Sequence, residues 1–79
     1  MFHITLKAAR VNAGFTRKEV AKIFGCHSQT IANYEYDSTN VPRPFFMKLE
    51  EVYGIPMQYL YFGQEEKFHE EKRKVLSAV

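Results

Sequence analysis

The sequence contains a single cysteine, Cys26, among its 79 residues. One cysteine excludes an internal disulfide, so a reducing compartment is the expected location. The first residues, MFHITLKAARVNAG, lack the basic start and the apolar run of a signal peptide. No stretch approaches the roughly 20 apolar residues that are needed to cross a membrane. These absences predict a soluble, cytoplasmic protein.

The chain is also too short to combine a large core with a deep catalytic cleft, because small domains bury a modest fraction of their surface. Its content of 46% hydrophobic and 15% aromatic residues is typical of a folded chain. The net charge is only +2, but residues 1–43 carry six Lys and Arg against three Asp and Glu. A mildly basic N-terminal half is compatible with a polyanionic partner.

Cys26 stands beside His27, and such a pair occurs both in metal sites and in thiol nucleophiles with their base. A zinc site needs four ligands, yet the sequence has no second cysteine, and His3 and His69 are remote. Catalysis is equally poorly supported, because adjacent side chains on a turn diverge and no third group orients the histidine. We therefore expect Cys26 to pack as a small apolar residue, with no metal, no cofactor and no enzymatic activity.

Capping signals predict the first two helices. Thr5 precedes apolar positions at helical spacing, and Gly14 can end that helix. Thr16 and Glu19 have the spacing of a capping box at the start of RKEVAKIF. Gly25 follows that segment and tolerates the positive φ of a helix end.

Later signals predict more helices and no sheet. Ser28 is expected to cap QTIANYE, Pro44 suits the first turn of PFFMKLEEVY, and Pro56 opens a short helix PMQYLYF. Residues 65–79 have the pattern of a charged helix with pairs of opposite charge four positions apart. The sequence thus predicts an all-α fold of five packed helices in residues 1–64 and a helical tail.

Only the short segment GCH joins the second and third predicted helices. A glycine-containing joint of that length suits two helices that cross at a steep angle. Ala21 supplies a small residue at the crossing, and Val20 and Ile31 supply apolar contacts. The outer face of the third helix would be polar and free of acidic residues, which suits the reading of base edges in a major groove. That face consists of His27, Ser28, Gln29, Thr30 and Asn33.

The segment TRKEVAKIFGCHSQTIANYE resembles the helix-turn-helix of the phage repressor family, which is of the Cro/repressor type and is also called the xenobiotic response element family. The flanking segments AARVNAGFT and MKLEEVYGIPMQYLYFG are similar to the first helix and the closing helix pair of that family. The resemblance covers roughly residues 4–63. It implies a five-helix lambda-repressor-like DNA-binding domain in residues 1–64, with residues 65–79 as an additional C-terminal helix.

The resemblance also implies roles for individual residues. Base contacts are implied for His27, Ser28, Gln29 and Asn33. Phosphate contacts are implied for Arg17, Thr30 and Arg43. Arg10 and Glu35 match a structural ion pair between the first helix and the end of the third.

Simpler interpretations remain open for several of these residues. Ser28 could act only as a helix cap, and Arg17 and Arg43 could be ordinary surface charges. Asp37 departs from the family pattern, since a carboxylate would face a phosphate backbone poorly. The aromatic residues after Lys48 do not predict a single-strand binder, because no Lys or Arg occurs between residues 49 and 66.

These features predict a sequence-specific regulator of transcription that binds double-stranded DNA. We expect a repressor of a phage, prophage or mobile element that binds a pseudo-palindromic operator as a homodimer, with half-sites about 34 Å apart. Residues 65–79 would either dimerise or dock on the domain. The alternative is an antitoxin-type interaction module that neutralises a toxin and regulates its own promoter. Its protein partner would then be the toxin, whereas a regulator could contact polymerase.

Overall fold

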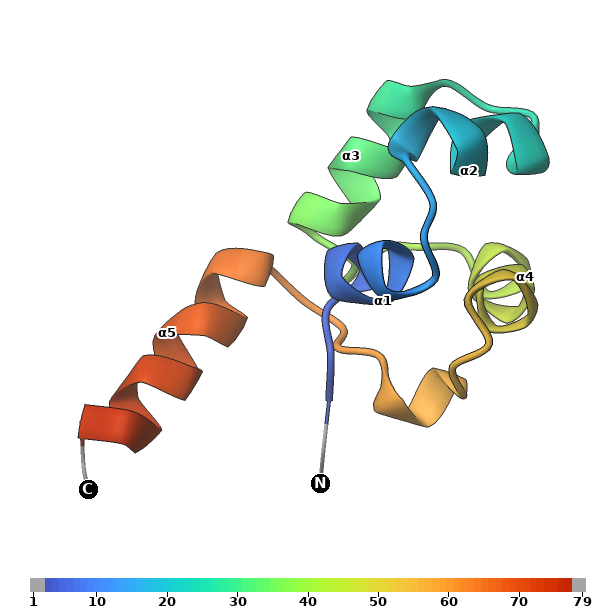
Figure 1. Ribbon diagram of the computed structural model, residues 1–79. Coiled ribbons are helices and arrows are strands. Elements are labelled where there is room, and N and C mark those ends of the chain that lie inside the picture. Colours follow the sequence, from blue (N-terminus) through green and yellow to red (C-terminus); the bar gives the residue numbers. More distant parts are fainter. Residues whose placement is uncertain (1–2, 78–79) are drawn as a thin grey trace.

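The computed structural model describes residues 3–77, and the side chains of residues 3–74 (Figure 1). Within this range the chain is helical and forms no strand; two isolated bridges join Ile4 to Leu60 and Asp37 to Gln64. The all-α fold class is therefore confirmed. The helices are α1 (Leu6–Asn12), α2 (Arg17–Phe24), α3 (Ser28–Tyr36), α4 (Arg43–Tyr53), the 3₁₀ helix η1 (Met57–Tyr59) and α5 (Glu65–Ser77).

The first two helices begin and end as the capping signals predict. The Ala8 N–H donates to Thr5 Oγ1 at 3.1 Å, so Thr5 caps α1. At α2 the capping box is complete: the Glu19 N–H donates to Thr16 Oγ1 at 3.2 Å, and the Thr16 N–H donates to Glu19 Oε1 at 2.9 Å. Gly25 ends α2 with φ of 68°, a left-handed conformation that glycine adopts without strain.

Two predicted helix boundaries are wrong. Ser28 is the first residue of α3 rather than its cap; the N-cap is His27, whose side chain makes no capping bond. The chain is still extended at His27 and becomes helical one residue earlier than expected. The predicted helix at residues 56–62 is reduced to η1, because the following backbone pairs with the N-terminal segment. The Tyr61 N–H donates to Ile4 O and the Ile4 N–H donates to Tyr59 O, both at 2.8 Å.

The core lies where α1, α2, α3 and α4 meet, with Leu60 closing it from the C-terminal side. α2 lies against α3, and α1 contacts both α3 and α4. Ala21 is buried, which agrees with the small residue expected where α2 meets α3, and Cys26 packs against the core as predicted. Phe46, Leu49, Leu60 and Val20 are the largest fully buried side chains.

α5 begins on the domain and then extends away from it (Figure 1). Its first turns are anchored by Phe68, whose ring centroid lies 4.8 Å from that of Tyr61. The preceding segment is held by Ser38, whose Oγ donates to Tyr61 O at 2.8 Å and accepts from the Gly63 N–H at 2.9 Å. The apolar residues Val75, Leu76 and Val79 near the end of the chain lie outside the described side chains. None of the helices in residues 3–77 combines the length and the apolar character that crossing a membrane would demand.

Candidate nucleic-acid interface

α3 divides its side chains between the core and solvent. Ile31 and Glu35 are buried, four residues apart on one face, as the helical period requires. Of the residues predicted to contact DNA, Gln29 and Asn33 lie on the opposite face, Ser28 is in the first turn, and His27 is the N-cap. His27, Ser28, Gln29 and Asn33 are exposed, and Thr30 is half-buried. Of these five residues, Ser28 and Gln29 line one hollow together with residues of α2, and Gln29 is hydrogen-bonded to Asn33.

Gln29 and Asn33 form an amide pair on this surface. Gln29 Nε2 donates to Asn33 Oδ1 at 2.9 Å, a contact between neighbouring turns of the helix. The bond uses one of the two Gln29 Nε2 hydrogens, so Gln29 keeps an acceptor, Oε1, and one N–H donor, and Asn33 Nδ2 keeps both of its donors. An amide that presents both an acceptor and a donor matches the N6 amino group and N7 atom of adenine. The pair therefore offers a partly pre-oriented base-reading group.

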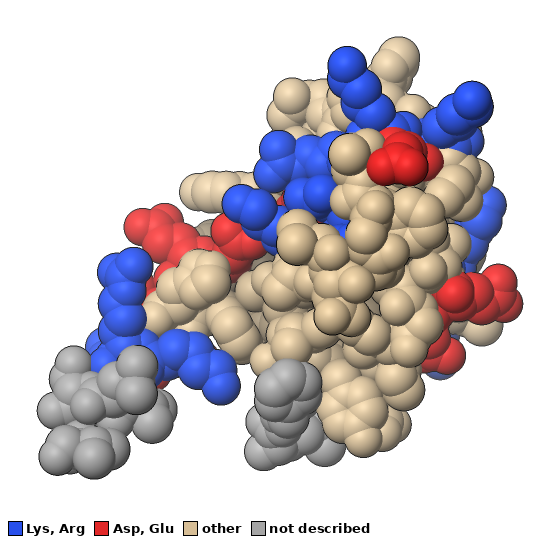
Figure 2. Space-filling model, viewed as in Figure 1, with Lys and Arg blue, Asp and Glu red and all other residues tan. Residues whose placement is uncertain are grey.

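A hollow lies between the N-terminal ends of α2 and α3, and we call it the basic hollow. Figure 2 shows that Lys and Arg side chains gather over the part of the molecule where α2 and α3 lie. Acidic side chains lie toward the start of α5, and smaller acidic groups lie among the basic side chains over α2 and at the edge of the molecule away from α5 (Figure 2). Positive charge beside an exposed polar helix is the arrangement that a phosphate backbone requires. The basic hollow is lined by Arg10, Thr16, Arg17, Lys18, Ser28, Gln29 and Ala32.

The Arg10–Glu35 ion pair expected from the family resemblance is present beneath this hollow. Arg10 Nε donates to Glu35 Oε2 at 2.6 Å, and the two side chains are 10% and 3% exposed. Arg10 Nη1 also donates to Phe15 O at 2.9 Å, which ties α1 to the segment before α2. Burial raises the pKa of the neighbouring Tyr53, and the charge of Glu35 raises it further.

Arg17 makes a contact that the sequence did not predict. Its Nε donates to Glu35 Oε1 at 3.0 Å, although its side chain remains 44% exposed. One buried carboxylate therefore holds two arginines. The sequence contains no signal for this bond, because Arg17 and Glu35 lie 18 residues apart, a separation that no helical or strand periodicity relates. Lys18 also lines the basic hollow, but it was not among the residues predicted to contact phosphate. Its position next to Arg17 in the first turn of α2 was a signal that could have identified it.

Arg43 is exposed at the first position of α4, and the structure does not place it in the basic hollow. It instead lines a separate hollow with Val41, Phe46, Met57 and Phe62. The Phe46 and Phe62 rings stack there with centroids 4.3 Å apart. A phosphate contact from Arg43 would therefore lie at a different point of the DNA backbone from one made by Arg17.

Asp37 has a local structural role in the loop after α3. Its Oδ1 accepts from the Thr39 N–H at 3.0 Å and from Thr39 Oγ1 at 2.6 Å. The Thr39 side-chain bond, and then the backbone bond, lower the pKa of the Asp37 carboxyl. An aspartate two residues before a threonine favours such a turn, so the sequence DST contained the signal. The carboxylate is thus occupied within its own loop.

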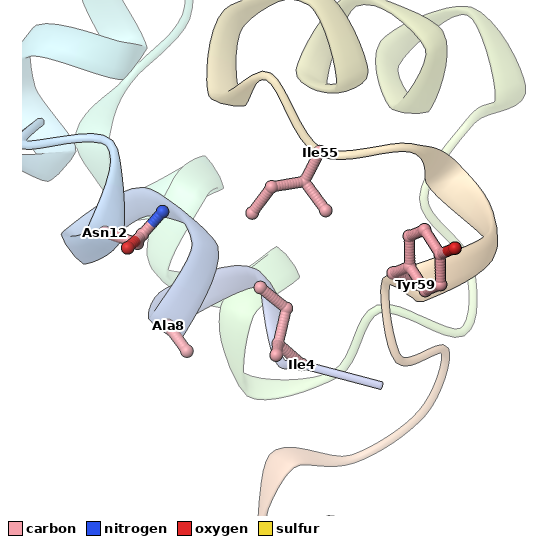
Figure 3. Close-up of a pocket in the computed structure, with 5 residues that line it drawn as sticks. All are labelled: Ile4, Ala8, Asn12, Ile55 and Tyr59. Atoms are coloured by element: carbon pink, nitrogen blue, oxygen red, sulfur yellow. The ribbon is translucent and has the colours of Figure 1, made fainter. Parts of the chain in front are cut away.

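Two further kinds of site could carry chemistry, a metal site and a second hollow. Among residues 3–77 no group of three or more His, Cys, Asp and Glu side chains is arranged to hold a metal ion. A largely apolar open hollow is lined by Ile4, Ile55 and Tyr59, with Ala8 and Asn12 of α1 on its other side (Figure 3). It has no basic residue in its lining and does not suit a nucleic acid.

Comparison with known proteins identifies the family. A family model described as Helix-turn-helix matches residues 6–60, from the start of α1 to Leu60, the residue after η1. The chain belongs to the helix-turn-helix family, and the resemblance to its Cro/repressor-type members is confirmed. It is similar to the HTH-type transcriptional regulator ImmR of Bacillus subtilis (strain 168), with 34% identity over 61 residues. The match covers 77% of this chain and 47% of that protein, so the chain spans about half the length of this relative.

Proposed function

We propose that this chain is a transcriptional regulator that binds double-stranded DNA in a sequence-specific manner. The observation that carries the proposal is the exposed amide pair of Gln29 and Asn33 beside the basic hollow. A helix of this size fits a major groove, and its N-terminal residues would meet the base edges. The similarity to a protein named as a transcriptional regulator supports the same function.

The proposed contacts divide into two kinds. His27, Ser28, Gln29 and Asn33 would contact bases, because all four are exposed, His27 at the N-cap of α3 and the other three on the helix itself. Arg17, Thr30 and Arg43 would contact phosphates and so set the position of the domain on DNA without reading sequence. Arg10 and Glu35 would keep α1 joined to α3 rather than touch bases.

We further propose that the protein acts as a homodimeric repressor on a pseudo-palindromic operator of a phage, prophage or mobile element. One recognition helix reads few base pairs, so two copies would supply the specificity. In this proposal residues 1–64 bind DNA and residues 65–79 dimerise. The extension of α5 beyond the domain supports this division. So does its charge pattern: Glu65 and Glu66 lie in the first turn and Lys74 in the last, which favours antiparallel pairing of two copies.

Selection from random double-stranded DNA, followed by sequencing, tests the proposed function. An enriched palindrome with half-sites about one helical turn apart is expected. Failure to enrich any sequence would remove the proposed function. An enriched single half-site would retain DNA reading but contradict the dimer.

Sedimentation equilibrium at micromolar concentration tests the dimer separately. The full chain should sediment as a dimer with or without operator DNA, and a chain that ends at residue 64 should sediment as a monomer in the absence of DNA. The same monomer mass for both chains, with DNA present as well, would count against residues 65–79 as the dimerisation element.

A further inference from the structure

Glu35 lies between the core and the basic hollow. Its side chain is 3% exposed and accepts from three nitrogen atoms: Arg10 Nε at 2.6 Å, Arg10 Nη2 at 3.4 Å and Arg17 Nε at 3.0 Å. Arg10 belongs to α1, Arg17 to α2 and Glu35 to α3, so the cluster joins three helices. A buried carboxylate is stable when it is paired and hydrogen-bonded, and this one is satisfied from two sides.

The charge of this cluster is not balanced. Two guanidinium groups share one carboxylate, so one positive charge remains. Arg10 is 10% exposed and Arg17 is 44% exposed, so the excess charge reaches solvent through Arg17. With Arg10 already neutralising Glu35, the second pair does not cancel the charge that Arg17 presents to the basic hollow.

The bond to Glu35 also restricts the orientation of Arg17. Nε is the inner nitrogen of the guanidinium group, and fixing it limits rotation of the whole planar fork. Among the described residues, the Arg17 guanidinium group donates to Glu35, and the donating atom is Arg17 Nε. Nη1 and Nη2 are therefore available for a bidentate contact of the kind that guanidinium groups make with phosphate.

We propose that Glu35 is a positioning residue for DNA binding, which holds Arg17 so that Nη1 and Nη2 face a backbone phosphate in the basic hollow. The inference rests on the proposed function, since it concerns a phosphate contact by Arg17. Glu35 itself touches no DNA in this arrangement. It acts by reducing the freedom that the Arg17 side chain would lose on binding. Arg10 then has a second role, because it allows Glu35 to hold Arg17 without removing its positive charge.

A double-mutant cycle on a selected operator tests this arrangement. Arg17→Ala should weaken binding about tenfold in the wild-type background and reduce the salt dependence by about one phosphate contact. In the Glu35→Gln background the same substitution should weaken binding by about twofold or less, because Arg17 is already unrestrained. Arg43→Ala is the matched control, since among the described residues Glu35 forms ion pairs with Arg10 and Arg17 but not with Arg43. Its effect should be equal in both backgrounds.

Each result decides a different point. An Arg17→Ala loss of equal size in both backgrounds would overturn the positioning role. A loss that shrinks equally for Arg17→Ala and Arg43→Ala would also overturn it, because Glu35→Gln would then have loosened the whole domain. If wild type and Arg43→Ala both bind every DNA sequence equally, the proposed sequence-specific function is contradicted, and the positioning role that rests on it is contradicted as well.

Arg17→Lys provides a second test that does not depend on the folding of Glu35→Gln. Lysine keeps the charge but lacks Nε and the planar fork. The variant should therefore keep the salt dependence of the wild type while losing most of the affinity that Arg17→Ala loses. An affinity equal to that of wild type would show that charge alone suffices and would overturn the proposal.

Discussion

Arg10→Met should destabilise the protein far more than Arg17→Ala, although both arginines bind the same carboxylate. Methionine retains most of the apolar stem of Arg10, so the variant chiefly removes its hydrogen bonds. Glu35 is 3% exposed and would lose both of its bonds from Arg10. One of them, from Arg10 Nε at 2.6 Å, is shorter than the bond from Arg17 Nε at 3.0 Å.

The expected magnitude follows from burial. Removal of one partner of a buried ion pair costs about 3–5 kcal/mol. Arg17 would still neutralise Glu35, so we expect the lower end, about 3 kcal/mol. For a domain of this size each kcal/mol lowers Tm by about 4–8 °C. The Arg10→Met variant should therefore melt about 12–24 °C below wild type.

Arg17→Ala is the matched control in the same assay. Its side chain is 44% exposed, and ion pairs of that kind contribute about 0–1 kcal/mol because solvent screens them. Unfolding by urea and by heat, followed by circular dichroism, measures both variants. Equal losses for the two variants, or a loss below about 1 kcal/mol for Arg10→Met, would refute the reasoning from burial.

Three further predictions concern the interface, a helix cap and pH. Gln29→Ala should weaken specific binding by about 1–3 kcal/mol and relax preference at one base position, and an unchanged preference in a binding titration would refute base reading by Gln29. Thr5→Ala should cost about 1 kcal/mol in urea unfolding, since it removes the acceptor for the Ala8 N–H, whereas Thr5→Ser should be close to wild type; equal losses would contradict a capping role. The folded-state pKa of Glu19 is lowered from its ordinary value of 4.5, chiefly by a hydrogen bond with the Thr16 backbone. The folded-state pKa of Asp37 is lowered from 3.8, chiefly by a hydrogen bond with the Thr39 side chain. Their contribution to stability is therefore present above those values and is lost as pH falls through the lowered ones. Asp37→Asn, which keeps the acceptor, should reduce the decline of Tm below about pH 4, and an unchanged decline would show that Asp37 has no part in it.

The parts of the fold that the sequence predicted correctly are those governed by local signals. Thr5, Thr16 and Gly25 sit at helix ends for reasons that involve residues at most four positions away. The exposed face of α3 follows from the helical period alone. The ion pair of Arg10 and Glu35 spans 25 residues and was expected because of the family resemblance rather than any local pattern.

The parts that the sequence did not predict depend on contacts between distant segments. The helix expected at residues 56–62 gives way after Tyr59, because Tyr61 pairs with Ile4 across the domain. The bond between Arg17 and Glu35 depends on how α2 crosses α3, which sequence spacing does not specify. α3 begins at Ser28, one residue earlier than predicted, because the extended backbone of the segment between α2 and α3 ends at His27.

The central claim is that the exposed face of α3 reads base sequence, and parallel selections from random double-stranded DNA by wild type and Gln29→Ala test it most directly. The account predicts an enriched palindrome for wild type and the same palindrome with one relaxed position in each half-site for Gln29→Ala. No enrichment by a folded wild-type protein, or identical consensus sequences for the two proteins, would contradict it.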